Sequence, residues 1–193
     1  MKGDIKSMRI ITGSAKGLKL KTPKGLDTRP TADRVKESVF SILNGLIDFS
    51  EVENVLDIFA GTGALGLESL SRGAHSATFI DFATAEIISE NVQRAKFQNC
   101  KILRGEFSKM LKKISAQNTK FDLIFCDPPY KKNLAAAAMN FVVDLNLLNE
   151  GGLMVVEYGA DEILNCESLE CVREINYGHT TNIKIFRTKG SEL

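Results

Sequence analysis

The pattern of apolar and polar positions divides most of the chain into short β-branched runs that alternate with amphipathic segments. Apolar residues spaced by three and four positions indicate helices, and compact apolar runs indicate buried strands. The predicted strands are residues 54–58, 77–80, 101–103, 121–126 and 153–158. The predicted helices that alternate with them are residues 64–71, 84–97, 108–115 and 134–147.

Such alternation predicts an α/β fold with a doubly wound, mostly parallel sheet, because each crossover helix returns the chain to the same edge. Two later runs, 169–175 and 182–188, flank Tyr177 and Gly178 and predict a C-terminal antiparallel hairpin. In this Rossmann-like arrangement a ligand binds beyond the carboxyl ends of the strands, at the topological switch point. Residues at and directly after the strand ends are therefore the candidates for ligand binding and catalysis.

The N-terminal part has a different pattern. Runs at 9–12 and 18–21 are separated by Gly13 and Gly17, which predicts a small basic β-hairpin. A helical pattern follows, with Thr31 as its expected cap. This helix should end near Asn44 or Gly45 or shortly after.

We expect one domain over residues 1–193. It comprises a hairpin and helix extension at 8–47 and a catalytic core at 52–189. No run approaches the roughly 20 apolar residues of a membrane span, and the first residues lack the apolar centre of a signal peptide. These features predict a cytoplasmic protein.

The charge is distributed unevenly, although the formal net charge is only +1. Residues 1–36 contain ten Lys or Arg and three Asp, whereas the remainder contains fifteen basic and twenty-one acidic residues. Clustered basic residues on an acidic body are typical of a surface that contacts phosphates. A merely solvated N-terminal arm is the alternative interpretation.

Metal chemistry is not expected from this composition. The four cysteines form no CxxC pair, and the two histidines do not lie at zinc-ligand spacing from them. We expect reduced structural thiols at Cys100, Cys126, Cys166 and Cys171.

The first strand of the alternating part runs into a glycine motif. Residues 61–66 match G-x-G-x-x-G, a pattern that by itself suggests a dinucleotide. Asp57 argues for a different cofactor, because its carboxylate would repel a pyrophosphate and attract the α-ammonium of S-adenosylmethionine (SAM). Asp81 ends the next strand, where a carboxylate can accept hydrogen bonds from ribose hydroxyls of either cofactor.

After the third strand, Glu106 offers an acceptor for the adenine amino group, with apolar neighbours to cover the ring. The predicted cofactor-binding residues are Asp57, Phe59, Gly61, Gly63, Asp81, Phe82, Glu106 and Phe107. Asp81 and Glu106 also have structural interpretations, as a strand-terminal turn residue and an ordinary surface glutamate.

The most specific motif is Asp127-Pro128-Pro129-Tyr130, directly after the strand at 121–126. Two prolines fix an extended backbone that offers carbonyl acceptors and no amide donors. If the Asp127 carboxylate and the Pro128 carbonyl each accept one N–H, they orient an aromatic amine towards a methyl sulfonium. Tyr130 would stack on the extruded base.

The carboxylate has a further effect in such a reaction. Positive charge moves from sulfur to nitrogen during methyl transfer, so a fixed Asp127 stabilises the transition state more than the ground state. This chemistry predicts a methyltransferase that acts on an exocyclic amine of a nucleic-acid base. A proline-rich turn without function is the structural alternative.

Together with this tetrad, residues 9–43 (RIITGSAKGLKLKTPKGLDTRPTADRVKESVFSIL) resemble the bacterial RsmD-type guanine-N2 methyltransferases of small-subunit ribosomal RNA. The resemblance extends from Met8 to about Thr188 and is carried most specifically by Thr28 to Glu37, similar to the family's RPT-x-DRV-(R/K)-E segment. It implies a class I methyltransferase fold, SAM as cofactor, and 16S rRNA in a partly assembled 30S subunit as partner.

The resemblance also implies RNA contacts at Arg9, Lys16, Arg29 and Arg34, each of which has a surface or capping role as its alternative. Lys36, like Lys16, stands where arginine is frequent in the family. Lysine keeps the charge and loses the bidentate fork, so we expect altered RNA geometry there.

Three other functions remain open at this point. An adenine-N6 DNA methyltransferase would use the same tetrad but ordinarily needs a sizeable target-recognition segment, which the short connections here do not offer. An NAD-linked oxidoreductase would use residues 54–81. A non-catalytic RNA-binding protein would retain the fold alone.

Overall fold

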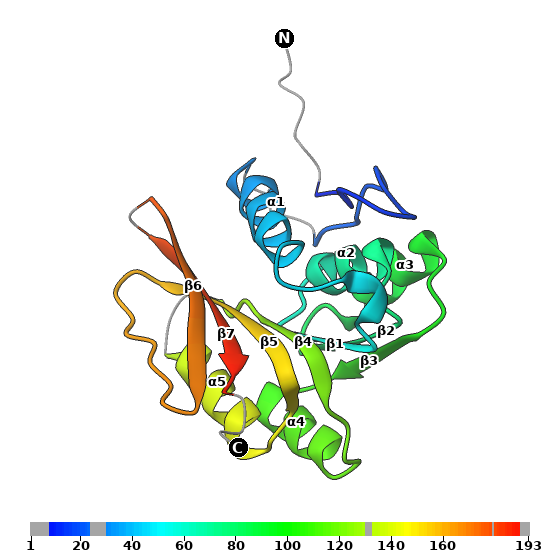
Figure 1. Ribbon diagram of the computed structural model, residues 1–193. Coiled ribbons are helices and arrows are strands. Elements are labelled where there is room, and N and C mark those ends of the chain that lie inside the picture. Colours follow the sequence, from blue (N-terminus) through cyan, green and yellow to red (C-terminus); the bar gives the residue numbers. More distant parts are fainter. Residues whose placement is uncertain (1–7, 24–29, 130–132, 179, 190–193) are drawn as a thin grey trace.

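The computed structural model describes residues 8–23, 30–129, 133–178 and 180–189, and all structural statements below refer to these residues. Seven strands form one sheet in the order β3-β2-β1-β4-β5-β7-β6 (Figure 1). The strands are β1 (Asn54–Ile58), β2 (Ser76–Asp81), β3 (Cys100–Arg104), β4 (Phe121–Cys126), β5 (Leu148–Gly159), β6 (Leu169–Tyr177) and β7 (Thr181–Thr188).

The first five strands are parallel, and β7 pairs antiparallel with both β5 and β6. The helices are α1 (Pro30–Leu43), α2 (Ala64–Arg72), α3 (Ala85–Ala95), α4 (Phe107–Ser115) and α5 (Leu134–Asp144), and a short 3-10 turn, η1, covers Phe49–Glu51. This arrangement confirms the expected doubly wound α/β fold with an antiparallel C-terminal strand.

The two faces of the sheet bury separate hydrophobic cores, because successive strand residues point to opposite faces. Alternate residues of β1 illustrate this: Val55 belongs to the core under α1, α2 and α3, whereas Leu56 and Ile58 belong to the core under α4 and α5. Helices cover both faces in Figure 1. This double coverage explains why the central strands are almost continuously apolar.

The predicted elements agree with the structure to within a few residues, with two differences at helix ends. The helix predicted at 84–97 ends at Ala95, because Lys96 adopts the left-handed conformation with φ of 60°. The helix predicted at 134–147 ends at Asp144, and the chain turns through Asn146, whose φ is 50°. Strand β5 then begins earlier than predicted, at Leu148.

The N-terminal segment 8–23, which we call the arm, is less regular than a hairpin. Its two runs form a single antiparallel bridge between Arg9 and Lys19. Ile10 and Leu20 are buried in the core under α1, α2 and α3, so the arm packs as part of the body. Helix α1 begins at Pro30, one residue before the predicted cap, as suits a proline at a first helical position.

The topology brings the carboxyl ends of β1 and β4 together. The chain leaves β1 towards β2 on one side, whereas β4 pairs with β1 on the other, in the register Ile58 to Cys126. This is the switch point at which open α/β sheets bind ligands. None of the helices in the described ranges is both long and apolar enough to cross a membrane.

Candidate functional site

The glycine loop between β1 and α2 turns through positive φ angles. Phe59, Gly61 and Gly63 have φ values of 61°, 57° and 78°. Gly66 lies in the first turn of α2, where an added Cβ would overlap the ring of Phe79. The glycines therefore let the loop turn sharply and let α2 pack closely on β2.

Asp57 lies at the centre of this turn and is 1% exposed. Its Oδ2 accepts a hydrogen bond from the Gly66 N–H at 3.0 Å, so the carboxylate faces the beginning of α2. Burial raises the pKa of Asp57 to about 7; the Gly66 hydrogen bond opposes this rise, and the nearby charge of Asp81 adds to it. A cationic ligand group beside this buried carboxyl would favour its ionised form and would be attracted by its charge.

Asp81 follows at the end of β2 and connects two parts of the site. Its Oδ2 accepts from the Gly61 N–H at 2.9 Å, and its Oδ1 accepts from the N–H groups of Ala83 and Thr84, each at 2.8 Å. These bonds hold the glycine loop and the entry to α3. The Oδ2 atom keeps one lone pair for a ligand hydroxyl.

Glu106 and the predicted aromatic residues lie beside the same edge. Glu106 is exposed and is the N-cap of α4, since its side chain accepts from the N–H groups of Ser108 and Lys109. The hydrogen bond from the Ser108 side chain is the main cause that lowers the Glu106 pKa. The rings of Phe59 and Phe107 lie 5.0 Å apart between centroids, while Phe82 is 73% exposed.

The tetrad begins where β4 ends. Asp127 and Pro129 are exposed and Pro128 is buried, while Tyr130 lies outside the described residues. The Asp127 pKa is raised well above 3.8, first because surrounding protein displaces solvent and then because Glu157 and Asp57 are negatively charged. The carboxyl therefore lies among many protein atoms while its residue keeps solvent access.

The register explains this electrostatic coupling. Phe125 of β4 pairs with Asp57 of β1 and with Val155 of β5. Asp127 and Glu157 each lie two positions further along these strands, so their side chains point to the same face of the sheet as that of Asp57. Three neighbouring strands, β1, β4 and β5, thus place carboxyl groups at their C-terminal ends. Such a site favours groups that bring or develop positive charge.

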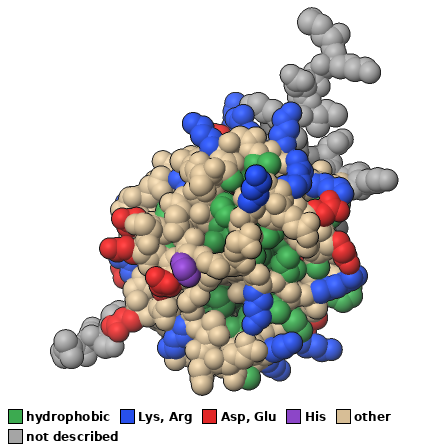
Figure 2. All heavy atoms as spheres, turned by 90° about the vertical axis from the view of Figure 1, so that its right-hand side faces the viewer, with side chains coloured by type: hydrophobic (Ala, Val, Ile, Leu, Met, Phe, Trp, Pro, Cys, Tyr) green, Lys and Arg blue, Asp and Glu red, His purple; other side chains and the backbone are tan. Residues whose placement is uncertain are grey.

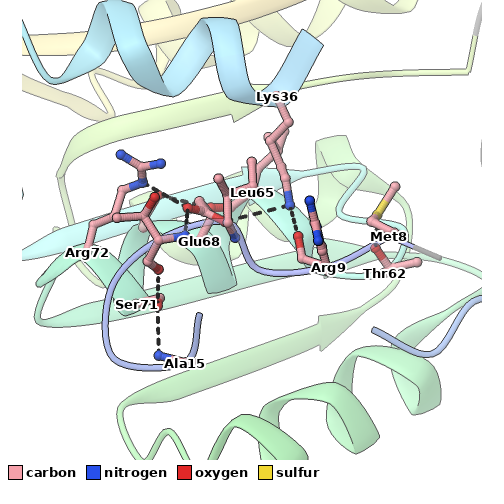
Figure 3. A network of polar contacts seen from close by, with 12 residues as sticks. Met8, Arg9, Ala15, Lys36, Thr62, Leu65, Glu68, Ser71 and Arg72 are labelled. Carbon is pink, nitrogen blue, oxygen red and sulfur yellow. Dashed lines mark hydrogen bonds and ion pairs between the residues drawn. The ribbon is translucent and has the colours of Figure 1, made fainter. Parts of the chain in front are cut away.

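The structure also contains a polar network that the sequence analysis missed (Figure 3). Glu68, fully buried in α2, accepts from the N–H groups of Ile11 and Thr12 at 2.7 and 3.1 Å. It also accepts from Arg72 Nε at 2.9 Å, and Lys36 Nζ lies 3.7 Å away. A charged residue among the apolar positions of a helix was the available sequence signal.

Three of the four candidate RNA contacts lie in the described residues. Arg9, Lys16 and Arg34 are exposed, whereas Arg29 lies outside the described residues. On the face shown in Figure 2, Lys and Arg side chains lie in the upper part and also along the lower right. Lys36 requires a correction: it is 5% exposed and donates to the Arg9 carbonyl at 2.6 Å, so it shapes the docking of the arm.

Within the described ranges, no group of three or more His, Cys, Asp or Glu side chains is arranged to hold a metal ion. The four cysteines are free. Burial raises the pKa of the Cys126 thiol, and the charges of Asp127, Asp57 and Glu162 raise it further.

Comparison with known proteins places this site in a family. The family described as Conserved hypothetical protein 95 matches residues 8–186. Ribosomal RNA small subunit methyltransferase D of Escherichia coli K12 is 36% identical over 152 residues, which cover 78% of this chain and 74% of that protein. The chain belongs to the ribosomal RNA small subunit methyltransferase D family.

Other members of this family match over similar or greater lengths. The Haemophilus influenzae protein of the same name is 36% identical over 167 residues, covering 84% of this chain and 83% of its own. Among solved structures, Escherichia coli yhhF superimposes with a TM-score of 0.79 at 32% identity and covers 95% of this chain and 98% of its own. The family match includes the arm as well as the sheet.

Proposed function

We propose that this chain transfers the methyl group of SAM to the exocyclic N2 amine of a guanine in 16S rRNA. The relatives named for small-subunit ribosomal RNA methylation support the reaction and the class of RNA. SMU.776, which shares the fold at 16% identity with a TM-score of 0.59, was solved in complex with SAH, the product of SAM. Guanine N2 rests on the RsmD-type resemblance.

One observation carries the proposal: the two predicted halves of the site meet at adjacent strand ends. The glycine loop follows Ile58, Asp127 follows Cys126, and these two residues pair in the sheet. A cofactor in the loop and an amine at Asp127 would therefore be neighbours. Holding two reactants in such proximity accounts for much of the rate enhancement in bimolecular transfers.

The residues around the loop fit SAM by their chemistry. Asp57 offers a buried carboxyl whose raised pKa would fall on contact with an α-ammonium, and Asp81 retains an acceptor position for a ribose hydroxyl. The Phe59 and Phe107 rings provide an apolar surface near Glu106. When bound, SAM supplies an electrophilic methyl group on a cationic sulfur.

The acceptors at the tetrad would prepare the amine. Asp127 and the Pro128 carbonyl each accept one N–H, which directs the nitrogen lone pair towards the methyl group. The charge of Glu157 next to Asp127 strengthens the negative potential where the nitrogen becomes positive. Tyr130 would stack on the flipped base, and the methylated amine would then release a proton to solvent.

The arm supplies the proposed RNA surface. Arg9, Lys16 and Arg34 are exposed on the arm and on α1, and with Arg29 they would contact phosphates near the target loop. We place the reaction in the cytoplasm, on 16S rRNA within a partly assembled 30S subunit. No membrane or metal takes part in this proposal.

A transfer assay with labelled SAM tests the proposal. Unmodified small-subunit particles, naked 16S rRNA and duplex DNA are offered in parallel, and the methylated product is digested to nucleosides. We expect N2-methylguanosine from the ribosomal RNA and its loss in Asp127→Ala. Incorporation into duplex DNA alone, as N6-methyladenine, would replace this proposal with a DNA methyltransferase.

A further inference from the structure

The arm contacts the glycine loop as well as helix α2. Thr62, in the middle of the loop, donates its hydroxyl to the Met8 Sδ of the arm at 3.1 Å. Figure 3 shows these two side chains facing each other at the end of the network that holds the arm. The arm proposed to bind RNA therefore touches the loop proposed to bind the cofactor.

A second connection runs through a fully buried side chain of α3, Asn91. Its Oδ1 accepts from the Lys21 N–H at 2.7 Å, and its Nδ2 donates to the Lys21 carbonyl and to the Thr62 carbonyl, each at 3.0 Å. A carboxamide offers an acceptor and two donors, and this one uses all of these functions. One side chain thus ties the end of the arm to the loop.

From these contacts we infer that Asn91 is a positioning residue that links RNA binding on the arm to cofactor binding in the glycine loop. The inference rests on the proposed function. The bond from Asn91 to the Thr62 carbonyl holds the loop at its middle, next to the Gly61 N–H that Asp81 binds. RNA that fixes the arm then fixes the loop, and by linkage the cofactor tightens RNA binding by the same factor.

One substitution, at a position outside the proposed cofactor site, can displace the arm from α2. At Gly13, with φ of +85°, an added Cβ would overlap the Ser71 backbone carbonyl, so Gly13→Ala must lift the arm from α2. Gly17 has φ of +84° and no atom within 4 Å of an added Cβ. Gly17→Ala is therefore a matched control, with the same backbone strain and no clash.

Calorimetric titration of the full chain with SAH, in the presence and absence of 16S rRNA, measures the linkage. In the wild type we expect the RNA to tighten SAH binding several-fold. Asn91→Ala should weaken SAH binding about tenfold without RNA. In this variant the ratio of SAH affinities with and without RNA should be close to one. Gly13→Ala should weaken SAH binding in the wild type and add little to Asn91→Ala.

Three further variants separate positioning from folding. Asn91→Asp keeps the acceptor for Lys21 and loses the donors, so it should resemble Asn91→Ala. Met8→Leu preserves volume, loses the acceptor of Thr62, and should weaken SAH binding about twofold. Gln93, exposed on the same helix, provides the neutral control Gln93→Ala.

The outcomes are distinct. Wild-type SAH affinity and an unchanged RNA effect in Asn91→Asp and Met8→Leu would overturn the linkage while leaving the proposed function intact. A wild-type chain that binds neither SAM nor SAH would remove the proposed function and, with it, this inference. Weakened SAH binding with an abolished RNA effect in the Asn91 variants, while Gln93→Ala and Gly17→Ala bind as the wild type does, would establish it.

Discussion

Replacing Glu68 with glutamine should destabilise the protein substantially, because this carboxylate is the anchor of the arm. It is fully buried, accepts from two backbone N–H groups of the arm, and faces the cations of Arg72 and Lys36. Removing one partner of a buried charge network costs about 3 to 5 kcal/mol. Glu68→Gln retains one oxygen acceptor, so we expect the lower end, about 3 kcal/mol.

Urea unfolding followed by circular dichroism measures this effect. With a slope of about 2 kcal/mol/M, the midpoint should fall by roughly 1.5 M with the slope unchanged. The control is Glu90→Gln, which breaks an ion pair whose side chains, Lys21 and Glu90, are 52% and 47% exposed. That variant should lose under about 1 kcal/mol.

A double variant tests the cause of the loss. Lys36→Met in the wild-type and Glu68→Gln backgrounds measures the coupling between these two side chains. Lys36→Met should cost less stability in the Glu68→Gln background, because its ion pair with Glu68 is already lost there. A loss in Glu68→Gln no larger than that in Glu90→Gln would refute the reasoning that a buried carboxylate anchors the arm.

Three further predictions concern the site. The pKa of Asp57 is about 7 in the free protein, so below pH 7 a cationic ligand group must displace the proton of this carboxyl. SAH affinity measured by calorimetry should therefore rise with pH up to about 7 and level off above it. An affinity that does not change with pH would contradict this prediction. Asp57→Asn should weaken binding and remove the pH dependence. Asp127→Ala should abolish turnover in the labelled-methyl assay while SAH affinity stays within about threefold, and retained turnover would exclude the proposed role. Filter binding at several salt concentrations measures how steeply RNA affinity falls with salt. Arg9→Ala and Lys16→Ala should each reduce this slope by about one phosphate contact, and an unchanged slope would exclude that residue from the RNA interface.

Much of the fold was predictable because local and tertiary requirements agree along the core strands. The run at 121–126 lies between the polar residues Lys120 and Asp127, and β4 begins and ends there; the run at 54–58 likewise matches β1. Helix ends were harder to place. Lys96 and Asn146 end helical patterns through left-handed conformations, for which the apolar spacing contains no signal.

The candidate site was predictable where its residues lie at the carboxyl ends of strands, as Asp57, Asp81 and Asp127 do. The hydrogen-bond partners of these residues were not, because the apolar pattern does not say which backbone N–H groups the carboxylates bind. Asp81 holds Gly61 and Ala83, and Glu106 caps its own helix, so these side chains have structural bonds beside any bonds to a ligand. Whether they also contact SAM stays a prediction.

The links between arm and body needed the tertiary structure. Glu68 pairs with backbone groups 56 and 57 positions away, and Asn91 pairs with Lys21 across 70 positions. The arm was expected to pair mainly with itself. It makes internal backbone bonds, such as those from the Ile10 N–H to the Leu18 carbonyl and from the Leu20 N–H to the Met8 carbonyl, and it also bonds to α2 and α3.

The central claim is methylation of guanine N2 in 16S rRNA, and mass mapping of that RNA tests it most directly. Small-subunit RNA is compared from cells that contain this gene, cells that lack it, and cells complemented with the wild type or Asp127→Ala. We expect one N2-methylguanosine that disappears without the gene, returns with the wild type, and does not return with Asp127→Ala. An unaltered 16S methylation pattern in cells lacking the gene would contradict it.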